Sequence, residues 1–546
     1  MVRRSLTLGV SVLLTFTLHA QWNDDPTQND PICTYSDAQY LPAIVSDGDG
    51  GAIVAWVDHR LGSSDKVYAQ RIDGDGVIQW TTDGVSVSDI EEHYGDVAMA
   101  DDGSGGAVMV FRVEAGNGID VYAQHIDGYG DRLWGANGMA ICTADQNQSL
   151  PDIIPDGQGG VFMTWMDARA LPWDIYAQHL DASGTALWGV DGTPVSTMSG
   201  SAWWPRVVAD ASGGIYVVWN DDRTEADRAY AQRLDAAGDP LWAPNGIELG
   251  SAPGRQSALD AVADGEGGLV VCWINYLDNT DIFAQRIDPS GGLLWSSTGL
   301  AVCDTTDRQD SPNIIYDGTN GVYIEWTDGR DPTLDDRLFA QHLDLDGTKL
   351  WAEQGVAVTA GNNCHHHVEF RGFGSDLISV WMEDSDIRAQ RMSPSGETLW
   401  GAASAVVCSA PGTADYPCLI ADDTGVISAW TDRRNSNQDI YCSKIFPDGR
   451  LTIPQNNGTI PPPYEATTRG GQLQIVLGEG SNWAGSLFMH DSLGRVIAML
   501  DTKGTRSATL DDSGWPVGML FAALRINDGI YGLRLFNTGS ALSILR

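Results

Sequence analysis

Residues 151–195 read PDIIPDGQGGVFMTWMDARALPWDIYAQHLDASGTALWGVDGTPV, and this stretch decides the fold. Turns rich in Gly and Asp separate four short apolar runs, approximately Pro151–Pro155, Val161–Met166, Asp174–Leu180 and the run that holds Trp188 and continues to Val195. Runs of this length, bounded by such turns, predict β-strands. The third run has apolar side chains on both alternating faces, so we expect a four-stranded sheet that is buried on both sides.

The same unit recurs along the chain at intervals of 49 to 55 residues. Its two landmarks are an aromatic residue that ends the second run and a tryptophan in the fourth. Self-similarity at this period, with four strands in each unit, is typical of the blades of a β-propeller. The first landmark is found at Trp56, Phe111, Trp165, Trp219, Trp273, Trp326, Trp381 and Trp430. The second is found at Trp22, Trp80, Trp134, Trp188, Trp242, Trp295, Trp351 and Trp400.

The eighth unit lacks its fourth strand, and the N-terminal segment offers a matching piece. Trp22 and the following Ile32-Cys33-Thr34 repeat the pattern of Trp134 and Ile141-Cys142-Thr143. We therefore expect residues 21 to about 38 to complete the last blade and close the ring, which removes exposed sheet edges. Residues 21–452 number 432, which is eight times 54. The alternative is an open solenoid, which would have no use for a unit split between two ends.

The first twenty residues have the form of a secretory signal peptide. Arg3 and Arg4 precede the apolar stretch Leu6–Leu18, which is too short to span a membrane, and cleavage is expected after Ala20. The net charge is −41, from 32 basic and 73 acidic residues. This charge excludes a nucleic acid as partner, because its phosphates would be repelled. We expect a monomer that is secreted or held at the outer cell surface.

A chain of 546 residues is too long for one core, and its composition changes after residue 452. Segment 453–470 is rich in Pro and predicts a linker. Segment 471–546 has the alternating pattern of a small β-sandwich. The predicted fold is therefore all-β: a signal peptide at 1–20, an eight-bladed propeller at 21–452 closed by its N-terminal strand, the linker, and the C-terminal sandwich.

Two motifs in the last segment resemble a known family. Residues 489–500 read MHDSLGRVIAML, and residues 529–546 begin with GIYGLRLF and end with ILR. These motifs resemble the C-terminal sorting domain, type A, of type IX secretion cargo from Bacteroidetes and their relatives. The resemblance implies that outer-membrane secretion machinery binds this domain, which is then cleaved, and that the protein is released or attached to the surface. An ordinary terminal sandwich module is the alternative.

Residues that recur in every unit are expected to be structural, since one reaction does not need eight copies of a group around a ring. Each repeated tryptophan would bury about 200 Å² between blades. The repeated glutamine, such as Gln178, would satisfy backbone groups inside its blade. In the D-x-R element, we expect the arginine, such as Arg169, to reach across the loop to the aspartate that opens the next strand, such as Asp174. A polar collar that binds a ligand is the alternative.

The D-G-x-G-G turns could attract calcium, which prefers carboxylate and carbonyl oxygens. Each turn has too few acidic residues to complete such a site, and positive φ explains its glycines. His365 and His367 would share one face of a strand and could hold a metal ion with Cys364 or Glu369. Other units offer no matching partner. We therefore expect no cofactor and no metal, with calcium kept as the alternative.

Residues that differ between units are the candidates for function, and they gather in the loops that open on one face before each first strand. Aromatic rings and arginines in one shallow mouth favour a glycan or peptide ligand over a metal ion or a phosphate. Scattered loop residues without function are the alternative. The candidate ligand-binding residues are Tyr40, His93, Tyr94, Trp203, Trp204, Arg206, Arg255, Arg308, His365, His367 and Tyr416.

Catalytic motifs are missing from the sequence, which contains no G-x-S-x-G, H-E-x-x-H or C-x-x-C pattern. We therefore expect a secreted or cell-surface module that binds a glycan or a protein and has no catalysis of its own. One alternative is an extracellular polysaccharide hydrolase or lyase with carboxylates in the mouth of the propeller, since acidic pairs are frequent. Another is a structural surface or adhesion component.

Four of the eight cysteines, Cys33, Cys142, Cys303 and Cys408, share the outer-strand position of their units. They would be far apart, and we expect them to be buried and mostly unpaired. Cys442 takes the place of the usual alanine in the third strand of the last unit, beside the strand of Cys33. Export permits a Cys33–Cys442 disulfide that would lock the closure. Two free thiols are the alternative, because register cannot be read from the sequence.

Overall fold

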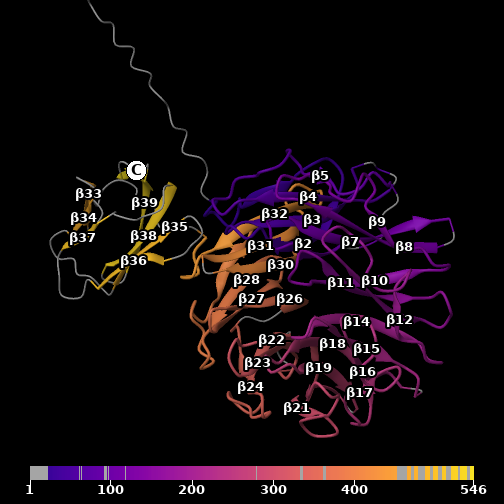
Figure 1. The fold of residues 1–546 in the computed structure, drawn as a ribbon. Helices are drawn as coiled ribbons and strands as arrows, with labels where there is room; N and C mark the ends of the chain where they lie inside the picture. Colours follow the sequence, from indigo (N-terminus) through magenta and orange to yellow (C-terminus); the bar gives the residue numbers. More distant parts are fainter. Residues whose placement is uncertain are drawn as a thin grey trace, which may run out of the picture. The chain divides into compact units, whose positions relative to one another are not determined.

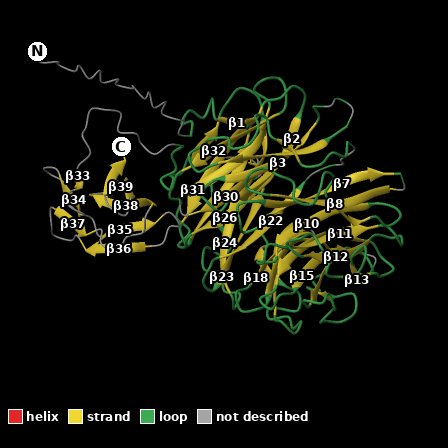
Figure 2. Cartoon of the chain, turned by 45° about the horizontal axis from the view of Figure 1, so that its top comes forward, coloured by secondary structure: helices red, strands yellow, loops and turns green. Residues whose placement is uncertain are grey.

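In this computed structural model the described residues run from 22 to 451, and then comprise the strands that lie between 464 and 545. Gaps within the first range lie at 61, 63, 92–94, 96, 117, 225, 278, 332–335, 361–363 and 423. The chain divides into two compact units, Met1–Ile453 and Pro454–Arg546. Within the described residues all regular secondary structure is β-strand (Figure 2), and no helix long and apolar enough to cross a membrane is found.

The first unit is an eight-bladed β-propeller whose blades are four-stranded antiparallel sheets (Figure 1). Blades 1 to 7 follow the chain as β2–β5, β6–β9, β10–β13, β14–β17, β18–β21, β22–β25 and β26–β29, and blade 8 consists of β30–β32 with β1. The first strands of neighbouring blades contact one another and therefore surround the central channel. We call these the axial strands: β2 (Gln39–Ser46), β6 (Ala98–Asp101), β10 (Gln148–Pro155), β14 (Ala202–Ala209), β18 (Arg255–Ala263), β22 (Gln309–Tyr316), β26 (Cys364–Phe373) and β30 (Ala414–Asp422).

The other three strands of each blade lie progressively farther from the channel. The second strands are β3 (Ala52–Asp58), β7 (Ala107–Ala115), β11 (Val161–Asp167), β15 (Ile215–Asp221), β19 (Leu269–Tyr276), β23 (Gly321–Asp328), β27 (Asp376–Glu383) and β31 (Gly425–Asp432). The third strands are β4 (Lys66–Ile72), β8 (Gly118–Ile126), β12 (Asp174–Leu180), β16 (Arg228–Leu234), β20 (Thr280–Ile287), β24 (Arg337–Asp344), β28 (Asp386–Met392) and β32 (Asp439–Ile445). The fourth strands are β5 (Val85–Ser86), β9 (Met139–Cys142), β13 (Thr193–Ser196), β17 (Ile247–Glu248), β21 (Leu300–Cys303), β25 (Val356–Ala357), β29 (Ala405–Cys408) and β1 (Asp30–Cys33).

The fourth strand is shorter than the repeat predicts. In blade 3 only an isolated bridge between Leu180 and Ala186 precedes it, and Trp188 lies before β13 instead of within it. The reason is Gly192, whose φ of 85° breaks the extended backbone between the tryptophan and the strand.

Tryptophan side chains form the core within and between blades. The first landmark, such as Trp165, is completely buried. The second, Trp188, donates its indole N–H to the carbonyl of Ala236 in the next blade at 3.1 Å. A Cβ added to Gly238 would come within 2.8 Å of the Trp188 ring, so this turn requires glycine. These contacts confirm the predicted structural role of the repeated tryptophans.

Axial strands carry a repeated bulge. Seven of the eight show a register shift near the start, and in six a non-glycine residue adopts a φ between 47° and 53°. This left-handed backbone is rare for residues with a side chain, and bulges of this kind redirect side chains next to functional sites. The six residues are Leu41, Leu150, Trp204, Ala258, Ser311 and Tyr416.

The fourth strand of blade 8 comes from the N-terminus. β1 pairs antiparallel with β32, with Asp30 opposite Cys442 and Cys33 opposite Ile440. The predicted Cys33–Cys442 disulfide is not formed, and both thiols are free. The register explains this result, because it offsets the two cysteines, and the Cys33 sulfur lies 3.5 Å from Nη2 of Arg60 instead.

The second unit contains two antiparallel sheets. One has the order β33-β34-β37, and the other has the order β36-β35-β38-β39-β40. β33 lies inside segment 453–470, so the linker is shorter than its composition predicts; the strand begins directly after the last of three prolines. The strands are β33 (Tyr464–Thr468), β34 (Gln472–Leu477), β35 (Ser486–Asp491), β36 (Val496–Asp501), β37 (Ser507–Asp511), β38 (Gly518–Ile526), β39 (Gly529–Asn537) and β40 (Leu542–Leu545).

Candidate functional site

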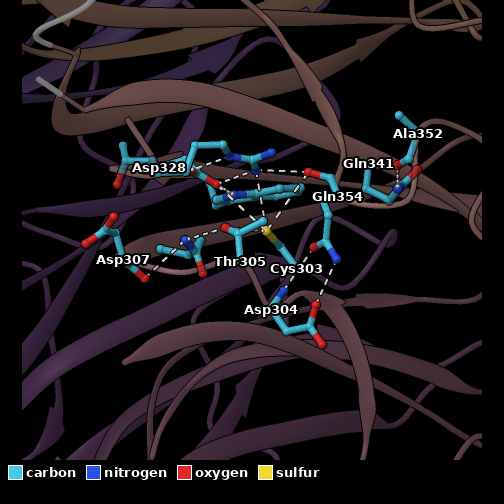
Figure 3. A network of polar contacts seen from close by, with 12 residues as sticks. Cys303, Asp304, Thr305, Asp307, Asp328, Gln341, Ala352 and Gln354 are labelled. Atoms are coloured by element: carbon cyan, nitrogen blue, oxygen red, sulfur yellow. Dashed lines mark hydrogen bonds and ion pairs between the residues drawn. The ribbon is translucent and has the colours of Figure 1, made fainter. Parts of the chain in front are cut away.

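The repeated D-x-R element joins neighbouring blades. Nε of Arg330 donates to Oδ1 of Asp328 at 2.8 Å, and Nη2 of Arg330 lies 3.5 Å from the sulfur of Cys303 in the preceding blade. Figure 3 shows this network around Cys303 and Asp328. The guanidinium also lies 3.8 Å from the centre of the Phe339 ring. The same Asp–Arg pairing recurs at Asp58/Arg60, Asp167/Arg169, Asp221/Arg223 and Asp432/Arg434.

This geometry corrects the expectation that the arginine would reach the aspartate opening the third strand. Arg169 pairs instead with Asp167, two residues earlier in the chain, through Nε at 2.8 Å and Nη2 at 2.6 Å. The short spacing lets both nitrogens of one planar fork meet both oxygens of one carboxylate, which is the stronger arrangement. The pair is largely buried, so it does not form a binding collar.

The repeated glutamine and the D-G-x-G-G aspartate also serve the fold. Gln178 donates to the carbonyl of Gly189 at 2.8 Å and accepts from the backbone N–H of Trp188 at 3.1 Å, as expected. Asp156 accepts from the backbone N–H of Gly160 at 2.8 Å, and its other oxygen contacts His179 Nε2 at 3.0 Å. The turn carboxylate is therefore engaged by donors of its own blade.

Trp203 and Trp204 lie together at the bulge of β14, with ring centroids 6.3 Å apart. Trp204 has a φ of 51°, and 49% of the residue is exposed. Arg206 follows on the same strand, and 55% of its side chain is exposed. Because axial strands surround the channel, we place Trp203 and Trp204 at its mouth, and Arg206, two residues farther along β14, below them.

Tyr416 occupies the same bulge position in β30, with a φ of 52° and 37% of the residue exposed. Blades 4 and 8 are half of an eight-membered ring apart. Tyr416 and Trp204 therefore stand at equivalent positions on opposite sides of the channel. They are the two aromatic residues among the six positive-φ bulge residues.

The predicted arginines of the mouth are paired with aspartates. Arg255 pairs with Asp227 from the preceding blade, and Arg308 pairs with Asp336 of its own blade. Half of each arginine side chain is exposed, whereas the aspartates are mostly covered. A mostly covered carboxylate thus holds each guanidinium in place at the surface.

Tyr40 belongs to a polar triad that the sequence did not predict. Its hydroxyl donates to Oδ2 of Asp65 at 2.9 Å, and Oδ1 of Asp65 lies 3.0 Å from Nδ1 of His59. Burial, together with the hydrogen bond to Asp65, raises the pKa of Tyr40 above its usual value. His59 remains partly exposed beside the mouth.

His59 and Arg433 were not predicted, but the sequence contains a signal for them, because both occupy the middle position of D-x-R. The flanking residues are constant, but the middle one varies. Its backbone N–H donates to the carbonyl of the residue at or before the start of the axial strand, as from His59 to Ala38 at 2.8 Å and from Arg433 to Thr413 at 3.0 Å. These side chains therefore stand next to the mouth. The varying residues are His59, Ala168, Asp222, Gly329 and Arg433.

Deeper in the channel, one axial position is polar in five consecutive blades. Asp152 accepts from the backbone N–H of Val207 in the next blade at 2.9 Å, and Nη1 of Arg206 lies 4.0 Å from its other oxygen. Burial, and to a lesser degree the charge of Asp260, raises the pKa of Asp152. The five residues, matched by strand register, are Asp152, Arg206, Asp260, Asn313 and Glu369.

Four predicted site residues cannot be placed. His93 and Tyr94 lie outside the described residues, and His365 and His367 belong to β26 with side chains that are not described. Their role in ligand binding stays a prediction, and a metal site at His365 and His367 stays its alternative. Elsewhere in the described part of the chain, no three His, Cys, Asp or Glu side chains are arranged to hold a metal ion.

No protein-family model and no curated protein matches this chain. Among solved structures, it is similar to a PL25 polysaccharide lyase, an ulvan lyase, at 12% identity and a TM-score of 0.42, over 80% of this chain and 97% of that one. It is also similar to a dihydro-heme d1 dehydrogenase at 13% identity and 0.37, over 74% and 75%. The GH43 endo-arabinanase of Bacillus licheniformis matches at 13% and 0.26, over 45% and 95%. Likenesses this distant carry no argument about activity.

Proposed function

We propose that the protein is an exported β-propeller that binds a glycan at the mouth of its channel, without catalysis of its own. The observation that carries this proposal is the exposed Trp204, held beside Trp203 in a left-handed bulge of an axial strand. The two adjacent rings form an exposed apolar patch, and contiguous patches of this kind mark binding sites.

The bulge supports this use of Trp204. The tryptophans of the two repeat landmarks pack within the ring. Trp204 belongs to neither landmark, and about half of it is exposed to solvent. Aromatic faces of this kind offer a large, rigid contact for the apolar face of a sugar ring. The neighbouring Arg206, and Tyr416 across the channel, add hydrogen-bond donors and a second ring.

The direct test is the Trp204→Ala variant in a binding assay with a panel of polysaccharides. A central aromatic contact is worth about 2 kcal/mol or more, so affinity should fall at least about thirtyfold. Tyr129→Ala is the matched control, because Tyr129 is 88% exposed in a turn between the third and fourth strands. Equal glycan binding by both variants would overturn the proposal. If the protein binds a peptide and no glycan, the proposed ligand class is wrong.

Export is part of the same proposal, and the terminal sequences support it. Residues 1–20 have the pattern of a signal peptide, and the motifs at 489–500 and 529–546 resemble the type IX sorting domain. The two sheets of the second unit are compatible with a small sandwich. Deletion of 471–546 in the native host should retain the protein in the periplasm. Unchanged surface or medium levels of the deletion protein would contradict this route.

A second candidate function is cleavage of a polysaccharide in the same mouth, and the Tyr40–Asp65–His59 triad favours it. With Nδ1 of His59 donating to Asp65, Nε2 carries the lone pair and could accept a proton from a substrate or water. Release of new reducing ends from polysaccharides would reveal such activity. Its loss in both His59→Ala and Asp65→Asn, with binding retained, would replace the binding-only proposal.

A further inference from the structure

We infer that the glycan bound at this mouth is electrically neutral, not a uronate or sulfated polymer. This inference rests on the proposed glycan-binding function and deepens it. It follows from how charge is arranged around the mouth.

Among the described residues, three arginines with exposed side chains at the mouth each stand beside an aspartate. Arg255 pairs with Asp227, Arg308 with Asp336, and Arg433 with Asp415. Each pair sums to zero, so the mouth presents guanidinium N–H donors without a net positive charge. Such donors suit hydroxyl oxygens, whereas an anionic group would also meet the carboxylate behind each arginine.

The aspartates are covered more than their arginines, which fixes their roles. Side-chain exposure is 50% for Arg255 against 18% for Asp227, and 39% for Arg433 against 12% for Asp415. The carboxylates therefore lie behind the guanidinium groups and are less accessible to a ligand. Oδ1 of Asp415 is buried and has no hydrogen-bond partner among the described residues, so its charge is not further compensated there.

The channel below the mouth has a slight excess of acid. At the axial position that is polar in five blades, Asp152, Asp260 and Glu369 are acidic and Arg206 is basic. Arg371, on the same strand as Glu369, pairs with it at 3.2 Å. Three acids and two bases give a charge of −1. The whole chain carries −41, so long-range repulsion also opposes an anionic polymer.

Removal of one aspartate from a pair should change the ligand class. Asp227→Asn and Asp336→Asn leave Arg255 and Arg308 with uncompensated charge. Affinity for an anionic glycan should then rise at least about tenfold, while affinity for a neutral glycan changes by less than about threefold. The matched control is Asp448→Asn, since Asp448 pairs with the exposed Arg450 at 3.5 Å in a turn outside the mouth.

The experiment measures binding of the full-length protein to linear arabinan, mannan and xylan as neutral probes, and to polygalacturonate and alginate as anionic probes. Binding is measured at about 50 mM and about 500 mM NaCl, because salt screens charge-driven binding and leaves neutral recognition nearly unchanged. We expect the unmodified protein to bind a neutral probe with the same affinity at both salt concentrations. The Trp204→Ala variant should lose this binding. Thermal melting of each variant confirms that it is folded.

The outcomes separate this inference from the proposal beneath it. Salt-sensitive binding of polygalacturonate or alginate to the unmodified protein, lost in Trp204→Ala, would overturn the neutral ligand and leave glycan binding at the mouth intact. Binding of no probe at all, or binding that Trp204→Ala leaves unchanged, would overturn both. No gain of anionic binding in Asp227→Asn and Asp336→Asn would overturn the charge argument alone.

Discussion

Trp22 packs on Gly76, which lies more than fifty residues away in the sequence. The indole N–H of Trp22 donates to the carbonyl of Gly74 at 3.0 Å, and a Cβ added to Gly76 would lie 3.2 Å from the indole ring. The contact therefore joins blade 8, through its N-terminal segment, to blade 1. The same pairing of a tryptophan with a glycine joins the other blades, as in Trp80/Gly130, Trp134/Gly184, Trp188/Gly238, Trp242/Gly291, Trp295/Gly347, Trp351/Gly396 and Trp400/Gly449.

Loss of this contact should destabilise the whole ring. Trp22 is only 3% exposed, and truncation of a buried tryptophan costs about 3–5 kcal/mol. We predict that Trp22→Ala lowers the free energy of unfolding by that amount in urea denaturation. The exposed Trp204→Ala serves as control and should stay near the unmodified protein. A Trp22→Ala protein as stable as this control would show that the N-terminal segment does not hold the ring.

Glu325 should make stability fall at alkaline pH. It is completely buried in β23, and Ser379 of the next blade donates to its Oε2 at 2.9 Å. Burial raises the pKa of Glu325 from 4.5 to about 8, against the smaller opposite effect of Ser379. The folded protein therefore keeps a proton that the unfolded chain releases, so stability falls as pH rises from about 4.5 to about 8.

Glu325→Gln should remove this dependence, since its amide is neutral at every pH. Relative to the unmodified protein, the variant should gain up to roughly 5 kcal/mol of unfolding free energy across that window, as unfolding in urea at successive pH values would measure. The two proteins should be similarly stable near pH 4. A constant difference between them at all pH values would contradict a protonated Glu325.

Asp156 should contribute stability that is lost in acid. Burial alone would raise its pKa, but contacts with His179 and the backbone N–H groups of Gln158 and Gly160 outweigh burial and lower its pKa below 3.8. The contribution is then present above about pH 4 and disappears as pH falls through the lowered value. Asp156→Asn should cost about 1–3 kcal/mol at pH 7 and little near pH 2. Asp346→Asn, at an exposed turn residue, is the control.

Replacement of Cys33 by serine should be tolerated, because blade 4 has a serine at the equivalent position. In blade 4 the equivalent residue is Ser196, whose hydroxyl accepts from Nη2 of Arg223 at 3.1 Å, as the Cys33 sulfur contacts Arg60 at 3.5 Å. We predict that Cys33→Ser changes stability by less than about 1 kcal/mol. Burial also raises the pKa of Cys33 to about 12, so its thiol should resist alkylation at pH 8 until the protein unfolds. A large fall in melting temperature on reduction would instead indicate a disulfide.

Local pattern determined the architecture of this protein. The spacing of residues such as Trp165 and Trp188 predicts a blade, because a two-faced sheet of four strands can bury its tryptophans only against copies of itself. The role of Gln178 could also be predicted, since its partners lie within the same blade. These inferences depend on short-range spacing, which a repeat displays several times over.

Tertiary structure alone decided the partners across loops and between ends. Arg169 turned back to Asp167 instead of reaching Asp174, and the register of β1 on β32 places Cys33 opposite Ile440, two residues from Cys442. Asp65, just before β4, contacts both Tyr40 of β2 and His59, just after β3. Such pairings depend on loop conformation and strand register. The same sequence pattern fits more than one loop conformation or register, so the pattern alone does not predict which side chains meet.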